Sequence, residues 1–431
     1  MSAIGNPQTP AGGCRVQPEA VSRPGRDKRQ VLYFLAADDT PVTARAPCWR
    51  RPLPLGPTAT VEATESAGGP GVSYGDYFQA VHRFLTADRC AVLVGAVKEQ
   101  SGRSVAPADL GPIRIYLEKH GQYYHPARVI VAVGNTRPAF VVNVAVTKTG
   151  RACLGQDYGN IRRLNDRFPY RFMPRVYGRG EAVFPGRCDR LEMFVGEWLE
   201  GYHEFHLSAD SAGRAPAKSA GNECRLVVWD PDKGVRPLPA LQQAEIYRCI
   251  ALILTAYYDL ESFEHIVAWH NAAGDFIVNT DGPRIDLRLI TVRKYVPLFT
   301  DVPLNADTIL QALLVFFLKL SIRIRLDRFD GVGAFGWADD AAVAAAVDGF
   351  FDGLALQARY ERIPPGLPGR FVNYLKVLSG EDRDALFEGI VLRMEGPVAE
   401  TALVREHLKR HGEELTQAID RLRPERGPPT I

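Results

Sequence analysis

The order of predicted elements is the feature of this sequence that most constrains its fold. Several short runs of alternating apolar residues between positions 110 and 200 are typical of β-strands, and they surround one amphipathic stretch at 156–168. Beyond Leu238 the apolar residues recur at steps of three and four over long stretches, which indicates helices. Strands followed by helices predict an α+β fold.

The composition indicates a folded protein with a sizeable core. The chain has 431 residues, of which 46% are apolar, so it is long enough for two or three domains or for one domain with two lobes. The formal net charge of +2 is close to neutral and gives no sign of a general affinity for nucleic acid or acidic membranes. We therefore expect neither as a partner.

Cysteine usage and apolar stretches bear on the compartment. The 7 cysteines are scattered and form no CxxC pair, which is typical of reduced thiols in a cytosol and argues against a zinc site. The N-terminus lacks a basic-then-apolar signal pattern, and the apolar stretches at 249–258 and 309–320 are too short or too polar at their flanks to span a bilayer. These features predict a soluble, cytoplasmic protein.

Domain boundaries follow from shifts in composition. Residues 1–72 are rich in Pro, Gly, Ala, Ser and Arg, which predicts a disordered tail, although the apolar run Val31–Leu35 could dock as a strand or a short helix. We place a helix and a strand-rich part at 73–200, a helical part at 201–422 and a frayed, Pro-rich end at 423–431.

An insert at 269–290 interrupts the helical half with two short apolar strands joined by a turn. Asp275 precedes the first strand and Asp286 lies in the second. Phosphoryl transfer needs metal ions on fixed carboxylates to neutralise negative charge. These acids are therefore candidate magnesium ligands if the hairpin register brings them to one end, and His270 is a candidate base or a cap of the turn. The alternative is a short hairpin with ordinary turn acids.

Two further charged residues are candidates for phosphate binding. Lys148 ends an apolar strand predicted at 139–148, and its flexible ammonium group could reach a phosphate. Asp157 lies on the following helix and could hold such a lysine in place. In the alternative, Lys148 is solvated at a strand end and Asp157 lies on a solvated helix face.

The stretch at 116–126 is dense in aromatic and ionisable side chains. Loops of this kind are either functional or packed against a partner surface. His120 and His125 are five residues apart outside a helix, which makes only a weak metal pair. A zinc-protease helix motif is not present, because H-E-x-x-H is absent from the sequence.

In its order of elements the chain resembles the protein-kinase-like superfamily, especially its aminoglycoside and choline kinase-like phosphotransferases. The resemblance spans roughly residues 110–400 and rests on that order and on the insert at 269–290. It implies a two-lobed fold with a strand-rich N-lobe and a helical C-lobe. The hinge between the lobes, which would contact the nucleotide, would begin at Glu197 and end at Gly201.

The family's catalytic loop reads H-G-D-x-x-x-x-N and precedes an apolar strand. The resemblance places Asp275 at the metal-binding Asn, His270 at the catalytic Asp, and Asp286 at the metal-binding Asp of the second strand. Lys148 would be the phosphate-binding lysine, and Asp157 would stand where the family's helix usually has a Glu.

The resemblance implies ATP as phosphoryl donor, Mg²⁺ between Asp275 and Asp286, and a hydroxyl acceptor on a small molecule or a protein. His270 would orient or deprotonate that acceptor in place of a carboxylate. The alternative is a catalytically inactive, pseudokinase-like scaffold that binds a protein partner through the 116–126 loop and the helical half.

Overall fold

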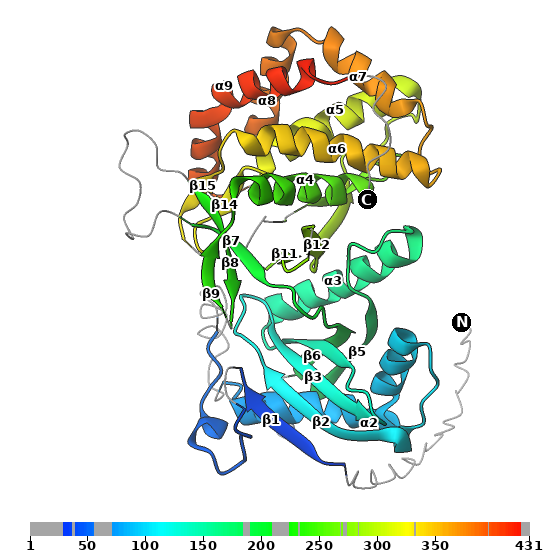
Figure 1. Cartoon of the computed structure of the whole chain (residues 1–431), viewed down its shortest axis with the longest axis vertical. Coiled ribbons are helices and arrows are strands. Elements are labelled where there is room, and N and C mark those ends of the chain that lie inside the picture. The colour runs from blue at the N-terminus through cyan, green and yellow to red at the C-terminus, as the bar shows by residue number, and fades with distance from the viewer. Residues whose placement is uncertain are drawn as a thin grey trace, which may run out of the picture.

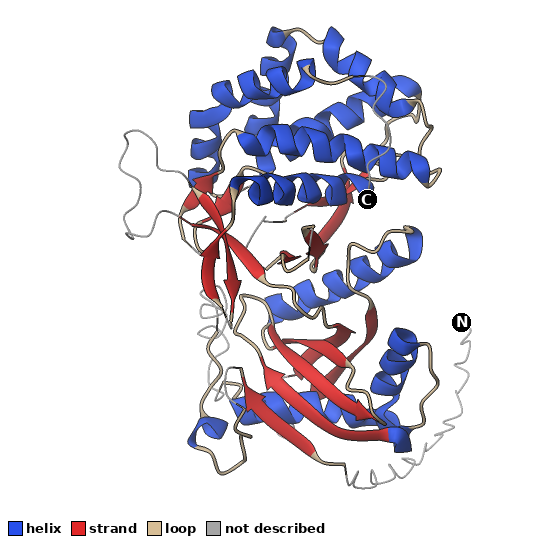
Figure 2. Cartoon of the chain, in the orientation of Figure 1, coloured by secondary structure: helices blue, strands red, loops and turns tan. Residues whose placement is uncertain are grey.

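The protein is described by a computed structural model and has a mixed α+β fold, as the sequence predicts. A sheet part, which ends at Glu197, precedes a helical part, which begins at Glu204 (Figures 1 and 2). The described residues are 29–36, 39–55, 71–183, 190–208, 224–231, 233–267, 269, 274–282, 284–331, 333–394 and 396–423.

The sheet part is built on a six-stranded sheet with the order β1-β2-β3-β4-β6-β5. β1 runs parallel to β2, and the other neighbouring strands are antiparallel. β3 and β4 form a hairpin around residue 135. The strands are β1 (Val31–Leu35), β2 (Leu110–Leu117), β3 (His125–Val133), β4 (Ala139–Ala145), β5 (Val176–Val183) and β6 (Arg190–Glu197).

Two helices pack against opposite faces of this sheet. Side chains alternate between the faces of a strand, so neighbouring residues serve different helices. Val195 joins a buried cluster with Leu85 of α2 (Tyr74–Ser101). Phe194 points the other way and packs with Leu154 of α3 (Lys148–Arg167). α3 therefore lies between the sheet and the helical part (Figure 1).

The predicted disordered tail at 1–72 needs correction where residues are described. Val31–Leu35 pairs with β2 along its whole length, so the apolar run docks as a strand. Trp49 packs so closely on Gly75 that a Cβ there would lie 2.3 Å from the indole nitrogen. Residues 1–28 and 56–70 lie outside the described residues. Composition alone missed β1 because its partner strand lies about 80 residues further on.

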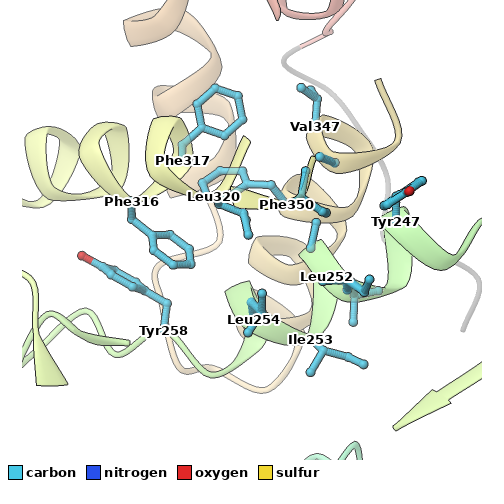
Figure 3. Close-up of a cluster of buried hydrophobic side chains, with 14 of the residues drawn as sticks. Tyr247, Leu252, Ile253, Leu254, Tyr258, Phe316, Phe317, Leu320, Val347 and Phe350 are labelled. Carbon is cyan, nitrogen blue, oxygen red and sulfur yellow. The ribbon is translucent and has the colours of Figure 1, made fainter. Parts of the chain in front are cut away.

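Helices fill most of the chain beyond Leu238, as the apolar periodicity predicts. The centre of this helical part is an aromatic core in which Tyr258 stacks on Phe316 at 4.5 Å and Phe317 meets Phe350 edge-on at 4.8 Å between ring centroids (Figure 3). The helices are α4 (Ala240–Ala256), α5 (Ala306–Arg323), α6 (Ala341–Arg359), α7 (Leu367–Val377), α8 (Gly380–Leu392) and α9 (Val398–Asp420).

α6 is long and apolar enough to cross a membrane by length and composition, and it is the one such helix among the described residues. However, 67% of the relevant window is buried inside the protein. Gly349 and Gly353 let α6 approach the backbone of α4, which explains the burial. Its apolar composition is that of a core helix.

Short strands connect the two parts. The predicted insert forms the hairpin β11–β12, and residue 203 bridges Val278 of that hairpin through two backbone hydrogen bonds of 2.9 Å. The connection from β6 to β7 therefore lies against the hairpin. The short strands beyond β6 are β7 (Glu204–Ser208), β8 (Arg225–Asp230), β9 (Gly234–Pro237), β10 (Glu264–Val267), β11 (Phe276–Asn279), β12 (Asp286–Leu289), β13 (Lys294–Pro297), β14 (Leu326–Arg328) and β15 (Phe335–Trp337).

The close packing of α4 on α6 gives a first prediction. A Cβ at Gly349 would lie 2.0 Å from the carbonyl oxygen of Arg248, so Gly349→Ala must push the helices apart. We expect a loss of about 1–3 kcal/mol in the free energy of unfolding, measured by urea denaturation. Gly389→Ala, in α8 with open space around it, is the matched control and should stabilise by about 0.5–1 kcal/mol. Equal effects of the two changes would contradict this packing.

Candidate functional site

The hairpin β11–β12 lies between α3 and the helical part (Figure 1). Its register pairs Phe276 with Leu289 at one end and Asn279 with Asp286 at the other. The carbonyl of Asp275 accepts a hydrogen bond from the Ile290 N–H at 2.8 Å, so Asp275 lies at the first end. The register thus separates the two predicted magnesium ligands by the length of the hairpin, and one ion cannot contact both.

Asp275 is fully buried and its carboxylate is occupied by protein donors. Arg293 donates from Nη1 to Oδ2 at 2.8 Å, and its Nη2 lies 2.6 Å from Oδ1. The Thr291 hydroxyl donates to Oδ1 at 2.7 Å. Burial by itself would lower the pKa of Arg293, but the Asp275 charge and hydrogen bond, together with the Asp157 charge, raise that pKa overall. This pair neutralises the charge that a metal would otherwise neutralise.

Asp157 lies beside this pair, and it is 1% exposed. Its carboxylate accepts hydrogen bonds from the Tyr124 hydroxyl and from the Val292 N–H, the latter at 2.7 Å. Burial raises the pKa of Asp157 to about 6, and the Tyr124 hydrogen bond and the Arg293 charge oppose that rise. The predicted helix acid therefore does belong to the junction, but its partners are a tyrosine and a backbone amide, not a lysine.

The loop 118–124, within the aromatic stretch noted in the sequence, contributes Lys119 and Tyr123 to this site. Lys119 forms an ion pair with Glu204, and a Cβ at Gly274 would lie 3.4 Å from its Nζ. Desolvation of the ammonium group by the surrounding protein lowers the pKa of Lys119 to about 8, although the side chain is 46% exposed and the Asp275 charge opposes the shift. Tyr123 places its ring 5.3 Å from the Arg293 guanidinium. The loop thus covers the Arg293–Asp275 pair from the sheet side.

Lys148 does not take part in this group. The predicted strand ends at Ala145, and Thr147 caps α3 by accepting a hydrogen bond from Gly150 N–H at 3.0 Å. Lys148 is therefore the first residue of α3, with an exposed side chain. Asp157 lies nine residues further along the helix, a rise of about 13 Å. The phosphate-binding role of Lys148 stays a prediction.

Asp286 lies at the end of the hairpin nearest the connection between the two parts. It accepts hydrogen bonds from the Tyr202 hydroxyl at 2.7 Å and from Arg288 at 2.9 Å. Glu197 ends β6, and its carboxylate accepts a hydrogen bond from the Arg175 N–H at 3.2 Å. Both acids stabilise the connection, and their ligand-binding roles stay predictions.

His270 lies outside the described residues, so its predicted role as base stays a prediction. The described residue just before it, Trp269, is anchored through its carbonyl, which accepts a hydrogen bond from Arg323 at 3.1 Å. Arg323 also pairs with the buried Glu400 of α9. The start of the 269–290 insert is thereby fixed to α5 and α9.

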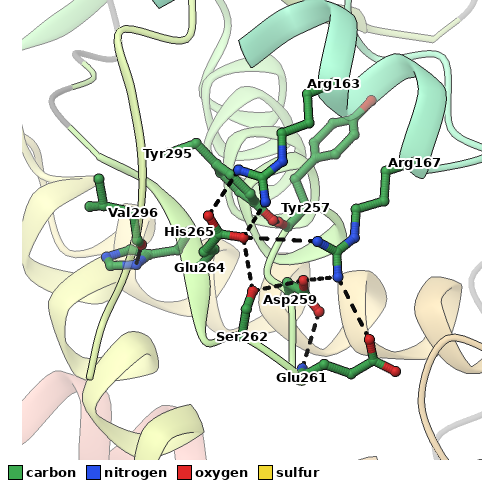
Figure 4. A network of polar contacts seen from close by, with 10 residues as sticks. All are labelled: Arg163, Arg167, Tyr257, Asp259, Glu261, Ser262, Glu264, His265, Tyr295 and Val296. Carbon is green, nitrogen blue, oxygen red and sulfur yellow. Dashed lines mark hydrogen bonds and ion pairs between the residues drawn. The ribbon is translucent and has the colours of Figure 1, made fainter. Parts of the chain in front are cut away.

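Ion pairs hold α3 to the helical part on the far side of Asp157. Arg163 binds Glu264 with both guanidinium nitrogens, at 2.9 and 2.6 Å (Figure 4). Arg167 pairs with the buried Asp259, and Ser262 donates hydrogen bonds to both acids. Because guanidinium and carboxylate groups match in planar geometry, these pairs also fix the orientation of the helix.

The predicted cofactors were compared with this geometry. Among the described residues no group of three or more His, Cys, Asp or Glu side chains is placed to hold a metal. Both Asp275 oxygens already accept hydrogen bonds, so the site as arranged does not fit Mg²⁺. Lys119 and Arg293, the cations that a nucleotide phosphate would meet here, are both paired with carboxylates.

Two cavities lie away from these residues. One, of about 540 Å³, is an open depression on α3 lined by Arg162, Arg163 and Arg167. The other, of about 210 Å³, lies between the starts of α5 and α7. Neither is lined by Asp157 or Asp275.

No protein-family model and no curated protein matches this chain. Among solved structures, "WaaP in complex with acyl carrier protein" is similar at 13% identity over 63% of this chain and 88% of that chain, with a TM-score of 0.24. The "microcompartment-associated aminopropanol kinase" is similar at 13% identity over 75% of this chain and 92% of that chain, also with a TM-score of 0.24. Superpositions with scores this low do not demonstrate a shared fold, and no functional argument rests on them.

The raised pKa of Asp157 predicts a pH dependence of stability. The folded state holds the proton up to about pH 6, whereas the ordinary carboxyl value is 3.8, so ionisation destabilises the fold. The free energy of unfolding should therefore fall by about 2 kcal/mol between pH 4 and pH 6, and by about 3 kcal/mol over the whole titration, relative to Asp157→Asn. Tyr124→Phe, which removes a donor to the carboxylate, should move this fall to higher pH. Identical pH profiles for Asp157→Asn and the unmodified protein would contradict the assignment.

The Arg293–Asp275 pair predicts a large and specific loss of stability. Arg293→Met leaves a buried carboxylate without its counter-charge and should cost about 3–5 kcal/mol in chemical denaturation. Adding Asp275→Leu to this variant should recover part of the loss. Arg288→Met removes a pair whose Asp286 side chain is 47% exposed, and as a matched control it should cost no more than about 1 kcal/mol. Equal losses for the two arginines would argue against a buried pair.

Proposed function

We propose that this chain is a kinase-like protein of two lobes that works as a binding protein and not as a magnesium-dependent phosphotransferase. The sheet part would be the N-lobe, the helical part the C-lobe, and the connection after Glu197 the hinge. The six-stranded sheet with α3 between β4 and β5, the short connection after β6 and the hairpin that contacts it support this arrangement. It corresponds to the pseudokinase-like scaffold expected as the alternative from the sequence.

The single observation that carries the proposal is the double contact of Arg293 with Asp275. A phosphotransferase of this kind needs carboxylate oxygens that are turned toward Mg²⁺ and its bound phosphates. In this chain a guanidinium group supplies the positive charge from within the protein. To bind Mg²⁺, the buried pair would first have to open, and breaking such a pair costs several kcal/mol. The site is therefore built to persist without a metal.

A second candidate is the nucleotide-dependent phosphotransferase implied by the resemblance, with ATP and Mg²⁺ as hypothetical cofactors. One observation favours it: the Lys119 ammonium group lies beside Gly274 and has a pKa lowered to about 8 by desolvation, with the Asp275 charge opposing. A lysine in this position could contact a phosphate once Glu204 releases it. In that case, Mg²⁺-dependent turnover of ATP should be lost in Asp275→Asn and retained in Asp384→Asn, an exposed control on α8.

Thermal shift measurements distinguish the two. We expect the unmodified protein to show no Mg²⁺-dependent rise in Tm with or without ATP. Arg293→Ala, which removes the two guanidinium contacts of the Asp275 carboxylate, should gain a rise of several degrees with millimolar Mg²⁺, because a metal that binds only the folded state stabilises it. The matched control Arg288→Ala should gain none. A Mg²⁺-dependent shift in the unmodified protein, accompanied by ATP consumption that Asp275→Asn abolishes, would overturn the proposal.

A further inference from the structure

The segment between β13 and α5 exposes an unusual number of large apolar side chains. Val296, Phe299, Val302 and Leu304 are 40, 37, 39 and 56% exposed, all within nine residues. Scattered apolar residues are normal on a protein surface, but a contiguous group commonly marks an interaction site. We call this stretch the apolar segment.

The apolar segment runs into the groove between the starts of α5 and α7. Leu304 is exposed and also lines the groove, whose floor includes the buried Leu260 and Leu367. Ile309 and Leu310 of α5 are half-buried along its wall. Its volume of about 210 Å³ is below the roughly 300–1,000 Å³ usual for small-molecule sites, and it suits a few side chains of a peptide.

The electrostatics of the groove favour an anionic occupant. Arg362 and Arg370 line it, and neither forms an ion pair with a described residue. The first residues of α5 and α7, Ala306 and Leu367, line the groove, and helix N-termini carry partial positive charge; the N-terminus of α5 is capped by Asn305 and has Asp307 in its first turn. The first turn of α7 has no side-chain cap. Glu261, the acid in the lining, lies 3.7 Å from Arg167.

We propose that the groove and the apolar segment together bind an acidic, amphipathic peptide segment of a partner protein. Large apolar side chains of that peptide occupy the groove beside Leu304, and its carboxylates lie against Arg362 and Arg370. This inference rests on the proposed function, because a peptide partner has a role only if the chain works as a binding protein. Its residues are separate from Asp275 and Arg293, so the two proposals can fail independently.

Fluorescence anisotropy with a defined probe tests this proposal. The probe is a short fluorescein-labelled peptide in which Glu residues alternate with Leu-Phe pairs. The matched probe has Lys at every Glu position. We expect saturable binding of the acidic peptide to the full chain and at least roughly tenfold weaker binding of the basic one. Leu304→Asp and Arg370→Glu should each weaken the acidic peptide by a similar factor. Val377→Asp, at a residue 83% exposed on α7, is the control and should bind normally.

Several outcomes would overturn the proposal. No saturable binding, equal binding of both peptides, or binding unchanged by Leu304→Asp and Arg370→Glu each contradict it. A concentration-dependent dimer in analytical ultracentrifugation that Leu304→Asp abolishes would mean that a second copy of the chain covers this surface. Each variant is compared with the unmodified protein by circular dichroism, so that a loss of binding is not a loss of fold. A failure to bind the peptide does not change the outcome of the Mg²⁺ thermal shift experiment, and the Mg²⁺ result does not change the outcome of the peptide experiment.

Discussion

The buried carboxylate of Asp275 is the group on which the arrangement between the two parts depends. A carboxylate without exposed surface needs a counter-charge, and Arg293 supplies it from beyond the second strand of the hairpin. The same guanidinium lies over Tyr123 and near Asp157. The 118–124 loop, α3 and the β11–β12 hairpin therefore meet at one ion pair, and a change at this pair affects the packing of all three.

α3 transmits this arrangement to the rest of the chain because its two sides serve different parts. Leu154 packs with the sheet through Phe194, whereas Asn160 donates a hydrogen bond to the Val292 carbonyl at 2.8 Å beyond the hairpin. Further along, Arg163 binds Glu264 (Figure 4). The helix is thus fixed at each turn, which suits a scaffold that holds one relative position of its parts.

Local periodicity was sufficient to predict the helices of the second half, because the apolar face of each helix is visible in the spacing of its own residues. Tertiary register was not predictable. A hairpin with four-residue strands puts Asp275 and Asp286 at opposite ends, and the strand predicted up to Lys148 ends at Ala145, after which Thr147 caps α3. Arg293 follows an apolar run, and nothing in the sequence indicates that it pairs with Asp275, because only the fold brings the two side chains together.

The most direct test of this account is a crystal soaked in Mn²⁺ with a nucleoside triphosphate, because Mn²⁺ substitutes for Mg²⁺ and scatters anomalously. The account predicts that Arg293 stays within hydrogen-bond distance of both Asp275 oxygens and that no anomalous peak lies beside that carboxylate. A peak at ligand distance from Asp275, with the Arg293 guanidinium displaced, would contradict it and would restore the phosphotransferase.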